Sequence, residues 1–208
     1  MPKPSSTLSD KLLKRFRALD ITRANIDKLY SQNLLSQTAK SRMYEGLFLS
    51  AHVSLEGFIE ELFFGLLVDG RGVKSSRNDI MPRINIKSHS IAREIVMGVG
   101  KKYVDWLPYD KTDQLSKLYF RGGRPFSDIT RPNKETLLKC SVIRNVIAHR
   151  SRHSIKQFEK QVIGTTPLLP KERNPAGYLE GLLRIAPAQT RFSNLLSQLS
   201  IIARDLSK

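Results

Sequence analysis

The sequence predicts an all-α fold, a helical bundle of about five to seven helices with two irregular insertions. Three observations support this prediction. Apolar residues recur at three- and four-residue spacing over long stretches, β-hairpin signals are almost absent, and glycine and proline gather in a few segments. With 208 residues and 40% hydrophobic content, the chain can form one well-packed domain. We expect that domain to span residues 1–208, with insertions at roughly 70–90 and 98–133.

The apolar periodicity places each helix in turn. A first pattern covers residues 8–19, and a second, weaker one follows over 26–34. Residues 40–68 form the strongest helix, whose apolar arc is broad enough for a central helix with neighbours on several sides. A short helix is expected over 90–99, and a last amphipathic helix runs from about residue 188 to the end.

Turn-forming residues break the pattern between these helices. "VDGRGVKSSRNDIMPR" contains two glycines and a proline, and "GTTPLLPKERNPAG" contains three prolines and two glycines. Both are predicted to be loops. The stretch that follows the short helix over 90–99, up to about residue 133, is expected to be irregular and includes the basic tip "RGGRPFSDITRP".

The charge balance indicates a polyanionic partner. Thirty-five Lys and Arg against 19 Asp and Glu give a formal net charge of +16. Such an excess favours binding to nucleic acid. The alternatives are a basic but inert surface, or a surface neutralised by an acidic protein partner.

The remaining composition suggests a soluble cytoplasmic protein. The single cysteine, Cys140, excludes an intrachain disulfide and fits a reducing compartment. The N-terminal residues lack the apolar core of a signal peptide. The most apolar segment is interrupted by His52, Glu56, Glu60 and Glu61, which are costly in a lipid bilayer, so no membrane association is expected.

One helix carries an unusual set of polar residues. "NKETLLKCSVIRNVIAHRS" is helical by its spacing, with Asn133 or Thr136 as a suitable N-cap, and is apolar nearly all round. We therefore expect it to be central or to lie at an oligomer interface. Its polar residues Arg144, Asn145 and His149 then need partners.

These three residues have a purely structural interpretation. Arg144 would pair with a carboxylate such as Glu56, Asn145 would bond to backbone, and His149 would sit at the helix end, where an imidazolium is favoured. The functional interpretation is that they supply a base with a suitable pKa, a phosphate-binding guanidinium and an orienting amide.

The stretch "RNVIAH" resembles the Arg-Asn-x-x-x-His form of the motif that marks the HEPN superfamily of helical domains. The preceding helix, "HVSLEGFIEELF", is similar to HEPN families associated with RNA-repair and restriction loci. The specific match covers about twenty residues, and the all-helical layout extends it loosely along the chain.

The resemblance implies a metal-independent endoribonuclease with no cofactor, in which two protomers bring their motif helices together across a basic cleft. Arg144 and His149 would be the catalytic pair and Asn145 a supporting residue. Glu56 is a weaker supporting assignment, because acidic positions vary among these families. The expected partners are RNA, a second copy of the chain and an antitoxin or companion defence protein.

The chemistry also follows from the residues themselves. RNA carries its own nucleophile, the 2′-hydroxyl, so His149 can act as general acid or base while Arg144 stabilises the charge on the phosphorane. Arg150 and Arg152 follow directly and are predicted to contact RNA phosphates. In an ideal helix Arg144 and His149 are about 140° apart around the axis. They would point at one atom only if the helix distorts or ends near His149, or if the other protomer completes the site, and we take the angle as support for a composite dimeric site.

Other candidate sites have weaker patterns. His149 and His153 are spaced for a metal, with Cys140 as the only nearby third ligand. Glu56, Glu60 and Glu61 could hold a divalent cation, or simply form a charged edge that pairs with Lys and Arg. "RGGRPF" suggests a phosphate-contacting loop but lacks a P-loop or dinucleotide fingerprint.

The sequence therefore supports a ranked set of functions. The first is a ribonuclease acting as a toxin or antiviral defence effector. The second is a non-catalytic HEPN module that binds RNA or scaffolds a defence or toxin–antitoxin complex. A DNA-binding regulator ranks last, because the motif helix is too apolar for an exposed recognition helix.

Overall fold

The computed structural model describes residues 3–68, 72–98, 103–183 and 186–208. Within these ranges the chain forms eight α-helices and two strands of two residues each, so the predicted all-α class is confirmed. These eight α-helices exceed the five to seven helices that the sequence predicted. Residues 70–71 of the first predicted insertion and 99–102 of the second lie outside the described ranges.

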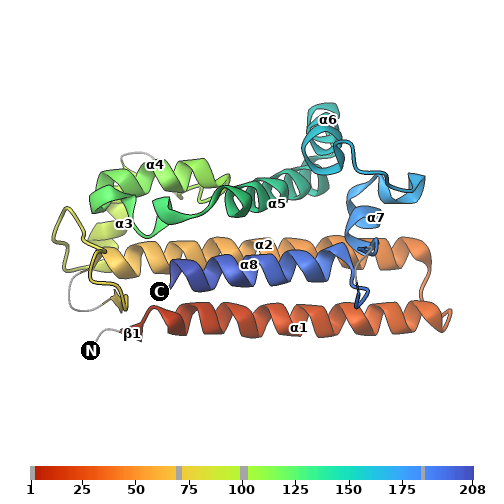
Figure 1. Ribbon diagram of the computed structural model, residues 1–208, viewed down its shortest axis with the longest axis horizontal. Helices are drawn as coiled ribbons and strands as arrows, with labels where there is room; N and C mark the ends of the chain where they lie inside the picture. The colour runs from red at the N-terminus through yellow and green to blue at the C-terminus, as the bar shows by residue number, and fades with distance from the viewer. Residues whose placement is uncertain (1–2, 69–71, 99–102, 184–185) are drawn as a thin grey trace.

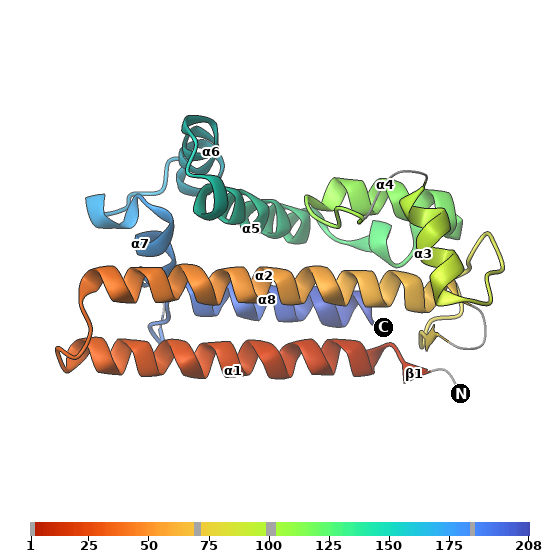
Figure 2. The same cartoon turned by 180° about the vertical axis from the view of Figure 1, so that it is seen from behind.

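The longer helices form layers that run roughly along one common direction, whereas α3, α6 and α7 lie across it (Figure 1). α1 makes one outer layer, α2 and α8 lie side by side in the middle, and α4 and α5 cover the other side (Figure 2). The bounds are α1 Ser6–Ser31, α2 Gln37–Leu67, α3 His89–Met97, α4 Tyr109–Tyr119, α5 Arg131–His149, α6 Arg152–Phe158, α7 Pro175–Glu180 and α8 Arg191–Leu206.

Short elements connect these helices. Strands β1 (Lys3–Pro4) and β2 (Val73–Lys74) pair in parallel, with Lys3 opposite Val73. The described residues also form three 3₁₀ turns, η1 Arg121–Gly123, η2 Phe126–Asp128 and η4 Pro170–Glu172. One π-helical turn, η3, spans Glu159–Ile163.

Helix α2 is the central element, as its broad apolar arc predicted. It contacts α1, α3, α5, α7 and α8. Its fully buried side chains include Tyr44, Leu55, Ile59 and Phe63. Burial of side chains of this size contributes about 1.5–3 kcal/mol each to stability, which makes α2 the main support of the bundle.

The two predicted segments of the first helix form one continuous helix. The pattern over 8–19 and the first part of that over 26–34 lie in α1, which ends at Ser31. Between the two patterns Arg23 donates to Asp20 and Asp27, at 2.8 Å in both cases. These i,i+3 and i,i+4 pairs stabilise the helix surface where the apolar stripe is interrupted.

The second predicted insertion is more ordered than expected. The stretch predicted as irregular contains α4, whose inward face is mainly polar: Thr112, Asp113 and Ser116 are buried beside Tyr109. The Thr112 hydroxyl donates to the Trp106 carbonyl, and Asp113 accepts from Ser127 at 2.7 Å. Because these polar groups are satisfied, a helix forms here without an apolar stripe.

Two further expectations need correction. The motif helix begins at Arg131 after Thr130, so neither Asn133 nor Thr136 is its N-cap. Helices α6 and α7 were missed, since both are short and lie next to stretches that resemble loops.

Candidate functional site at the end of helix α5

Helix α5 places the predicted motif near its C-terminal end. Pro132 in the first turn suits a helix start, because proline has no N–H to leave unpaired. The inner side of α5 buries Leu137, Cys140 and Ile143. The helix ends at His149 because Arg150 adopts the left-handed conformation, with φ 45° and ψ 28°.

The motif residues lie on the outside of the bundle, not in its interior. Asn145 and His149 are exposed and Arg144 is partly buried. Leu138, on the same side of α5, is 43% exposed. Of the two positions expected for this helix, the interior of the bundle is therefore not where a single chain places these polar groups, and the position at an oligomer interface stays a prediction.

The structure brings Arg144 and Asn145 together. The Arg144 guanidinium donates from Nη1 to Oδ1 of Asn145 at 3.2 Å. Among the described residues Arg144 has no carboxylate partner. The His149 side chain makes no hydrogen bond to any described residue. The His149 imidazole and most of the Arg144 guanidinium are therefore free to bind a ligand.

Glu56 does not join this group. Its carboxylate lies 3.5 Å from Nδ1 of His52, one turn earlier on α2. No ion pair within the described ranges joins Glu56 to Arg144, so the structural pairing considered from sequence is not found.

Arg150 is held by the protein itself. Its Nη2 donates to Oε2 of Glu45 on α2 at 2.9 Å, and its N–H donates to the Val146 carbonyl at 3.1 Å. The sequence predicted Arg150 as an RNA contact, and this stays a prediction because the side chain is 71% exposed. The ion pair also makes Arg150 a link between the motif end of α5 and α2. Glu45 was missed because nothing in the sequence connects residues 105 positions apart.

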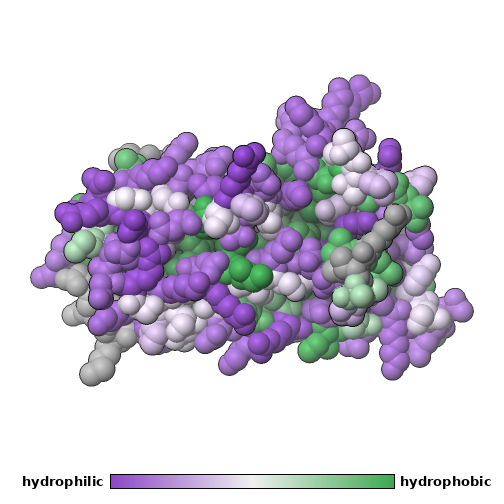
Figure 3. Space-filling model, in the orientation of Figure 1, coloured by the Kyte–Doolittle hydropathy of each residue, from purple (hydrophilic) through white to green (hydrophobic). Residues whose placement is uncertain are grey.

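The segment after the motif forms a basic projection. α6 and η3 stand out from the end of the bundle (Figures 1 and 2), and this part of the surface is coloured as strongly hydrophilic in Figure 3. Exposed cationic or titratable side chains without an ion pair in the described structure are Arg152, His153, Lys156 and Lys160. Arg152, Lys156 and Lys160 outnumber the one exposed carboxylate of this projection, Glu159, and so give the motif end a net positive charge suited to a polyanion.

Cys140 lies on the buried side of the same helix. It is 1% exposed, and burial raises the pKa of its thiol to about 12. In an ideal helix it points about 180° away from His149. The two side chains cannot bind one metal ion, which removes the His149–His153–Cys140 site considered from sequence.

His52 is a second buried group behind α5. It is 3% exposed, and neither ring nitrogen has a hydrogen-bond partner within the described residues. With Cys140 and apolar side chains of α2 and α8 it lines a cavity with about 10 Å³ of space for the centre of a water molecule. That is about the room one water molecule needs, so this space does not admit a substrate.

The carboxylates of α2 are paired with basic groups. Glu60 pairs with Arg93, and Glu61 lies 3.7 Å from Lys11. No group of three or more His, Cys, Asp or Glu residues suited to a metal ion is found in the described ranges. In the "RGGRPF" loop, Arg124 is bound by Asp79 at 2.5 Å, so this guanidinium is engaged by the protein.

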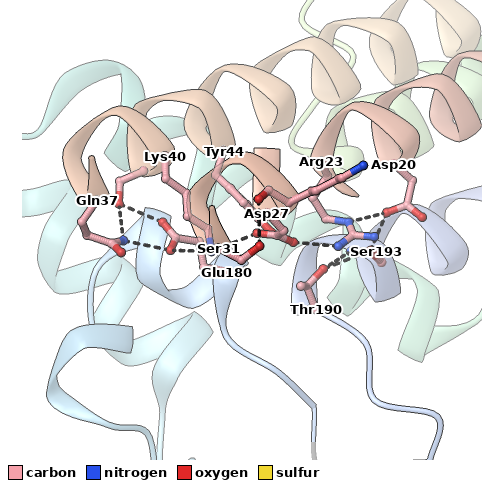
Figure 4. A network of polar contacts seen from close by, with 12 residues as sticks. Asp20, Arg23, Asp27, Ser31, Gln37, Lys40, Tyr44, Glu180, Thr190 and Ser193 are labelled. Atoms are coloured by element: carbon pink, nitrogen blue, oxygen red, sulfur yellow. Dashed lines mark hydrogen bonds and ion pairs between the residues drawn. The ribbon is translucent and has the colours of Figure 1, made fainter. Parts of the chain in front are cut away.

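A polar network supports the bundle beside the motif end (Figure 4). Tyr44, fully buried, donates to both oxygens of Asp27 at 2.9 and 3.0 Å. Burial and this carboxylate raise the pKa of Tyr44 well above its usual value. Lys40 lies 2.9 Å from Asp27 and 3.8 Å from Glu180 of α7. These groups satisfy one another, so the network joins α1, α2 and α7 and offers no open ligand position.

Comparisons with known proteins identify no relative of this chain. Searches against protein-family models, curated proteins and solved structures give no significant match. No helix in the described residues is long and apolar enough to cross a membrane.

Proposed function

We propose that the protein is a metal-independent endoribonuclease of the HEPN type, acting in the cytoplasm as a toxin or antiviral defence effector. The observation that carries the proposal is the group Arg144, Asn145 and His149 at the end of α5, next to the basic projection of α6. Asn145 and His149 are exposed and Arg144 is partly buried. Two features support it. The imidazole and guanidinium are accessible, and the surrounding charge is positive.

The reaction needs only groups that this chain and RNA supply. The 2′-oxygen bonds to the phosphorus while the bond from phosphorus to the 5′-oxygen breaks. A proton leaves the 2′-hydroxyl and another is delivered to the departing 5′-oxygen. His149 performs one of these transfers, and Arg144 stabilises the negative charge of the phosphorane. The products are a 2′,3′-cyclic phosphate and a 5′-hydroxyl.

Asn145 and Arg150 have positioning roles in this proposal. The amide oxygen of Asn145 holds one end of the Arg144 guanidinium, which reduces the number of orientations open to it. Arg150, tied to Glu45, fixes the turn that ends α5 directly after His149. Arg152, without an ion pair within the described ranges, is the better candidate for contact with an RNA phosphate.

A single helix does not direct both catalytic groups to one phosphate. Arg144 and His149 remain about 140° apart around α5, because the helix continues without a break between them. A second copy that packs its α5 against the exposed side of the first would bring Arg144 of one chain towards His149 of the other. The exposed Leu138 on that side would be covered in the same contact.

The test is cleavage of an end-labelled RNA in excess EDTA by the wild type, His149→Ala and His153→Ala. His153 is the matched control, because it is an exposed histidine of the adjacent helix α6. We expect wild type and His153→Ala to leave cyclic phosphates, and His149→Ala to be about 10²–10⁴-fold slower. Loss of wild-type cleavage in EDTA, or full activity of His149→Ala, would contradict the proposal.

The second candidate is a non-catalytic HEPN module that binds RNA or scaffolds a defence complex. The angle between Arg144 and His149 within one chain favours it, since binding does not need their convergence. This module would bind RNA through the α6 projection without cleaving it. A folded wild type that binds varied RNAs but cuts none of them would place this candidate first.

An active ribonuclease of this kind needs control in the cell. Uncontrolled RNA cleavage is lethal, so we expect an inhibitor or companion protein. Induced expression of the wild type alone should then arrest growth, and His149→Ala should relieve the arrest.

A further inference from the structure

One outer surface of the protein is built on two chain segments that pair antiparallel, residues 81–83 and 119–121. Their central residues, Pro82 and Phe120, form an antiparallel bridge. Phe120 is fully buried and packs edge-on against Phe63 of α2, with 5.1 Å between the ring centroids. Because side chains alternate along an extended segment, the residues on either side of this bridge point outwards. These residues are Met81, Arg83, Tyr119 and Arg121.

Contacts with the paired segments position the two guanidinium groups of this surface. Arg83 donates from Nε to the Phe120 carbonyl at 3.2 Å, and no described residue binds its Nη groups. Nη1 of Arg121 lies 3.9 Å from Sδ of Met81, which is 47% exposed. A guanidinium that is already positioned loses less conformational freedom on binding, and its planar fork matches a carboxylate.

Helix α3 extends this surface with aliphatic side chains. The Tyr119 hydroxyl donates to the Ile95 carbonyl at 3.3 Å, which joins α3 to the paired segments. Ile95 is 46% exposed, and Ile91, one turn earlier, is 51% exposed. The helix packs on the bundle through Ala92 and Val96, which are buried, so neither isoleucine is needed for the core. We refer to Met81, Arg83, Ile91, Ile95, Tyr119 and Arg121 together as the α3 surface.

The composition of the α3 surface is typical of a protein interface. Arg, Tyr and Met are enriched where proteins bind one another, whereas Lys, Asp and Glu are depleted. Exposed aliphatic side chains beside polar groups also mark such sites. Single-stranded RNA binds chiefly through phosphate contacts and stacking on aromatic rings, so the isoleucine and methionine side chains would add little to its binding. The composition therefore favours a protein partner over a nucleic acid.

The charge of the α3 surface indicates what kind of protein it binds. Arg83 and Arg121 form no ion pair with a described residue, whereas Arg93 of α3 is neutralised by Glu60 of α2. Glu94 is the only acidic residue on the elements that form the surface, so its net charge is positive. A two-fold contact with a second copy of the chain would bring like charges together, which is unfavourable. An acidic partner is therefore complementary.

We propose that the α3 surface binds an acidic amphipathic segment of another protein. The carboxylates of this segment would bind the two free guanidinium groups, and its apolar residues would cover the exposed aliphatic side chains. Helix α3 and the motif end of α5 lie towards opposite ends of the bundle (Figure 2). Binding at the α3 surface is therefore independent of the proposed ribonuclease and leaves the motif uncovered.

The test is an NMR titration of the ¹⁵N-labelled chain with a helical peptide that has one face of leucines and one of glutamates. We expect the amides of residues 81–83, 91–95 and 119–121 to shift saturably. Arg121→Gln and Ile95→Ala should each weaken binding about tenfold, because each removes a central contact. Arg204→Gln and Ile201→Ala are the matched controls, because both residues are exposed on α8, and they should bind as the wild type does. Circular dichroism checks that all four variants are folded.

Control ligands separate this partner from other ligands. A peptide with glutamine in place of glutamate, or with serine in place of leucine, should bind much more weakly. Equal binding of the glutamine peptide, or equal weakening by Arg121→Gln and Arg204→Gln, would overturn the proposal. So would the absence of saturable shifts at millimolar peptide. Binding of polyuridine or phosphatidylserine vesicles, weakened by Arg121→Gln while the peptide does not bind, would assign the surface to RNA or to a membrane instead.

The same variants separate this proposal from the proposed ribonuclease. His149→Ala should bind the glutamate peptide as the wild type does, and Ile95→Ala should leave any RNA cleavage unchanged. Loss of peptide binding in His149→Ala would contradict the independence of the two sites.

Discussion

Asp27 is the residue whose replacement gives the sharpest test of what holds the helices together. It accepts hydrogen bonds from the fully buried Tyr44, and it pairs with Arg23 at 2.8 Å and with Lys40 at 2.9 Å. Asp27→Asn keeps the shape of the side chain but removes its charge. It also turns one oxygen into an NH₂ group that faces donors.

The expected loss follows from these contacts. A hydrogen bond to a charged group contributes about 1.5–3 kcal/mol, and exposed ion pairs contribute about 0–1 kcal/mol each. The Asp27 side chain is 30% exposed and that of Lys40 is 14% exposed, so solvent screens both ion pairs in part. Asparagine can still accept from Tyr44, which retains some of that bond. We therefore expect Asp27→Asn to lower the free energy of unfolding by about 2–3 kcal/mol.

Urea unfolding followed by circular dichroism measures this loss. Asp10→Asn is the matched control, because Asp10 is an exposed aspartate of the same helix without an ion pair in the described structure. The double variant with Tyr44→Phe should lose less than the two single changes added together, since both remove the same hydrogen bond. A change below about 0.5 kcal/mol in Asp27→Asn, or a change equal to that of Asp10→Asn, would refute the assignment.

Three further measurements check other parts of the structure. Arg150→Gly should be more stable than Arg150→Ala by about 1 kcal/mol in urea unfolding, because both lose the Glu45 pair and only glycine adopts the left-handed conformation freely. Cys140, with its pKa raised to about 12 by burial, should resist Ellman's reagent at pH 8 until the protein is unfolded. Phe63→Ala should lower the free energy of unfolding by about 3–5 kcal/mol, because Phe63 is fully buried. Leu118→Ala should leave it nearly unchanged, because Leu118 is 68% exposed.

The helices that could be predicted are those with apolar stripes. The stripe of α2 shows in the sequence because its side chains enter one core from several sides. Helix α4 could not be found in this way, since three of its four buried residues, Thr112, Asp113 and Ser116, are polar and only Tyr109 is aromatic. Their hydrogen bonds come from residues such as Trp106 and Ser127, which the sequence does not place nearby.

The candidate site also has parts that could be predicted from the sequence and parts that could not. The sequence identified Arg144, Asn145 and His149 as unusual, and the structure places them on one accessible end of α5. Their exposure could not be predicted, because Leu138 on the same side is apolar and suggested burial. The role of Arg150 was also hidden, since its partner Glu45 is brought close only by the packing of α5 on α2.

The angle between Arg144 and His149 leads to a test of the proposed composite site. If each site takes Arg144 from one chain and His149 from the other, Arg144→Ala and His149→Ala should complement each other. A mixed dimer of the two variants then has one intact site and one that lacks both groups. With random exchange, half of the dimers are mixed, so the mixture should regain roughly one quarter of the wild-type activity.

A site within one chain predicts no such recovery, because every chain in the mixture lacks one catalytic group. The measurement is the cleavage rate after the two inactive variants are unfolded together and refolded, compared with each variant treated alone. Arg144→Ala mixed with Arg144→Lys is the matched control, since neither chain then supplies the arginine. Recovery in the first mixture alone would place the guanidinium and the imidazole of one site on different chains, in agreement with the angle of about 140° between Arg144 and His149 around α5.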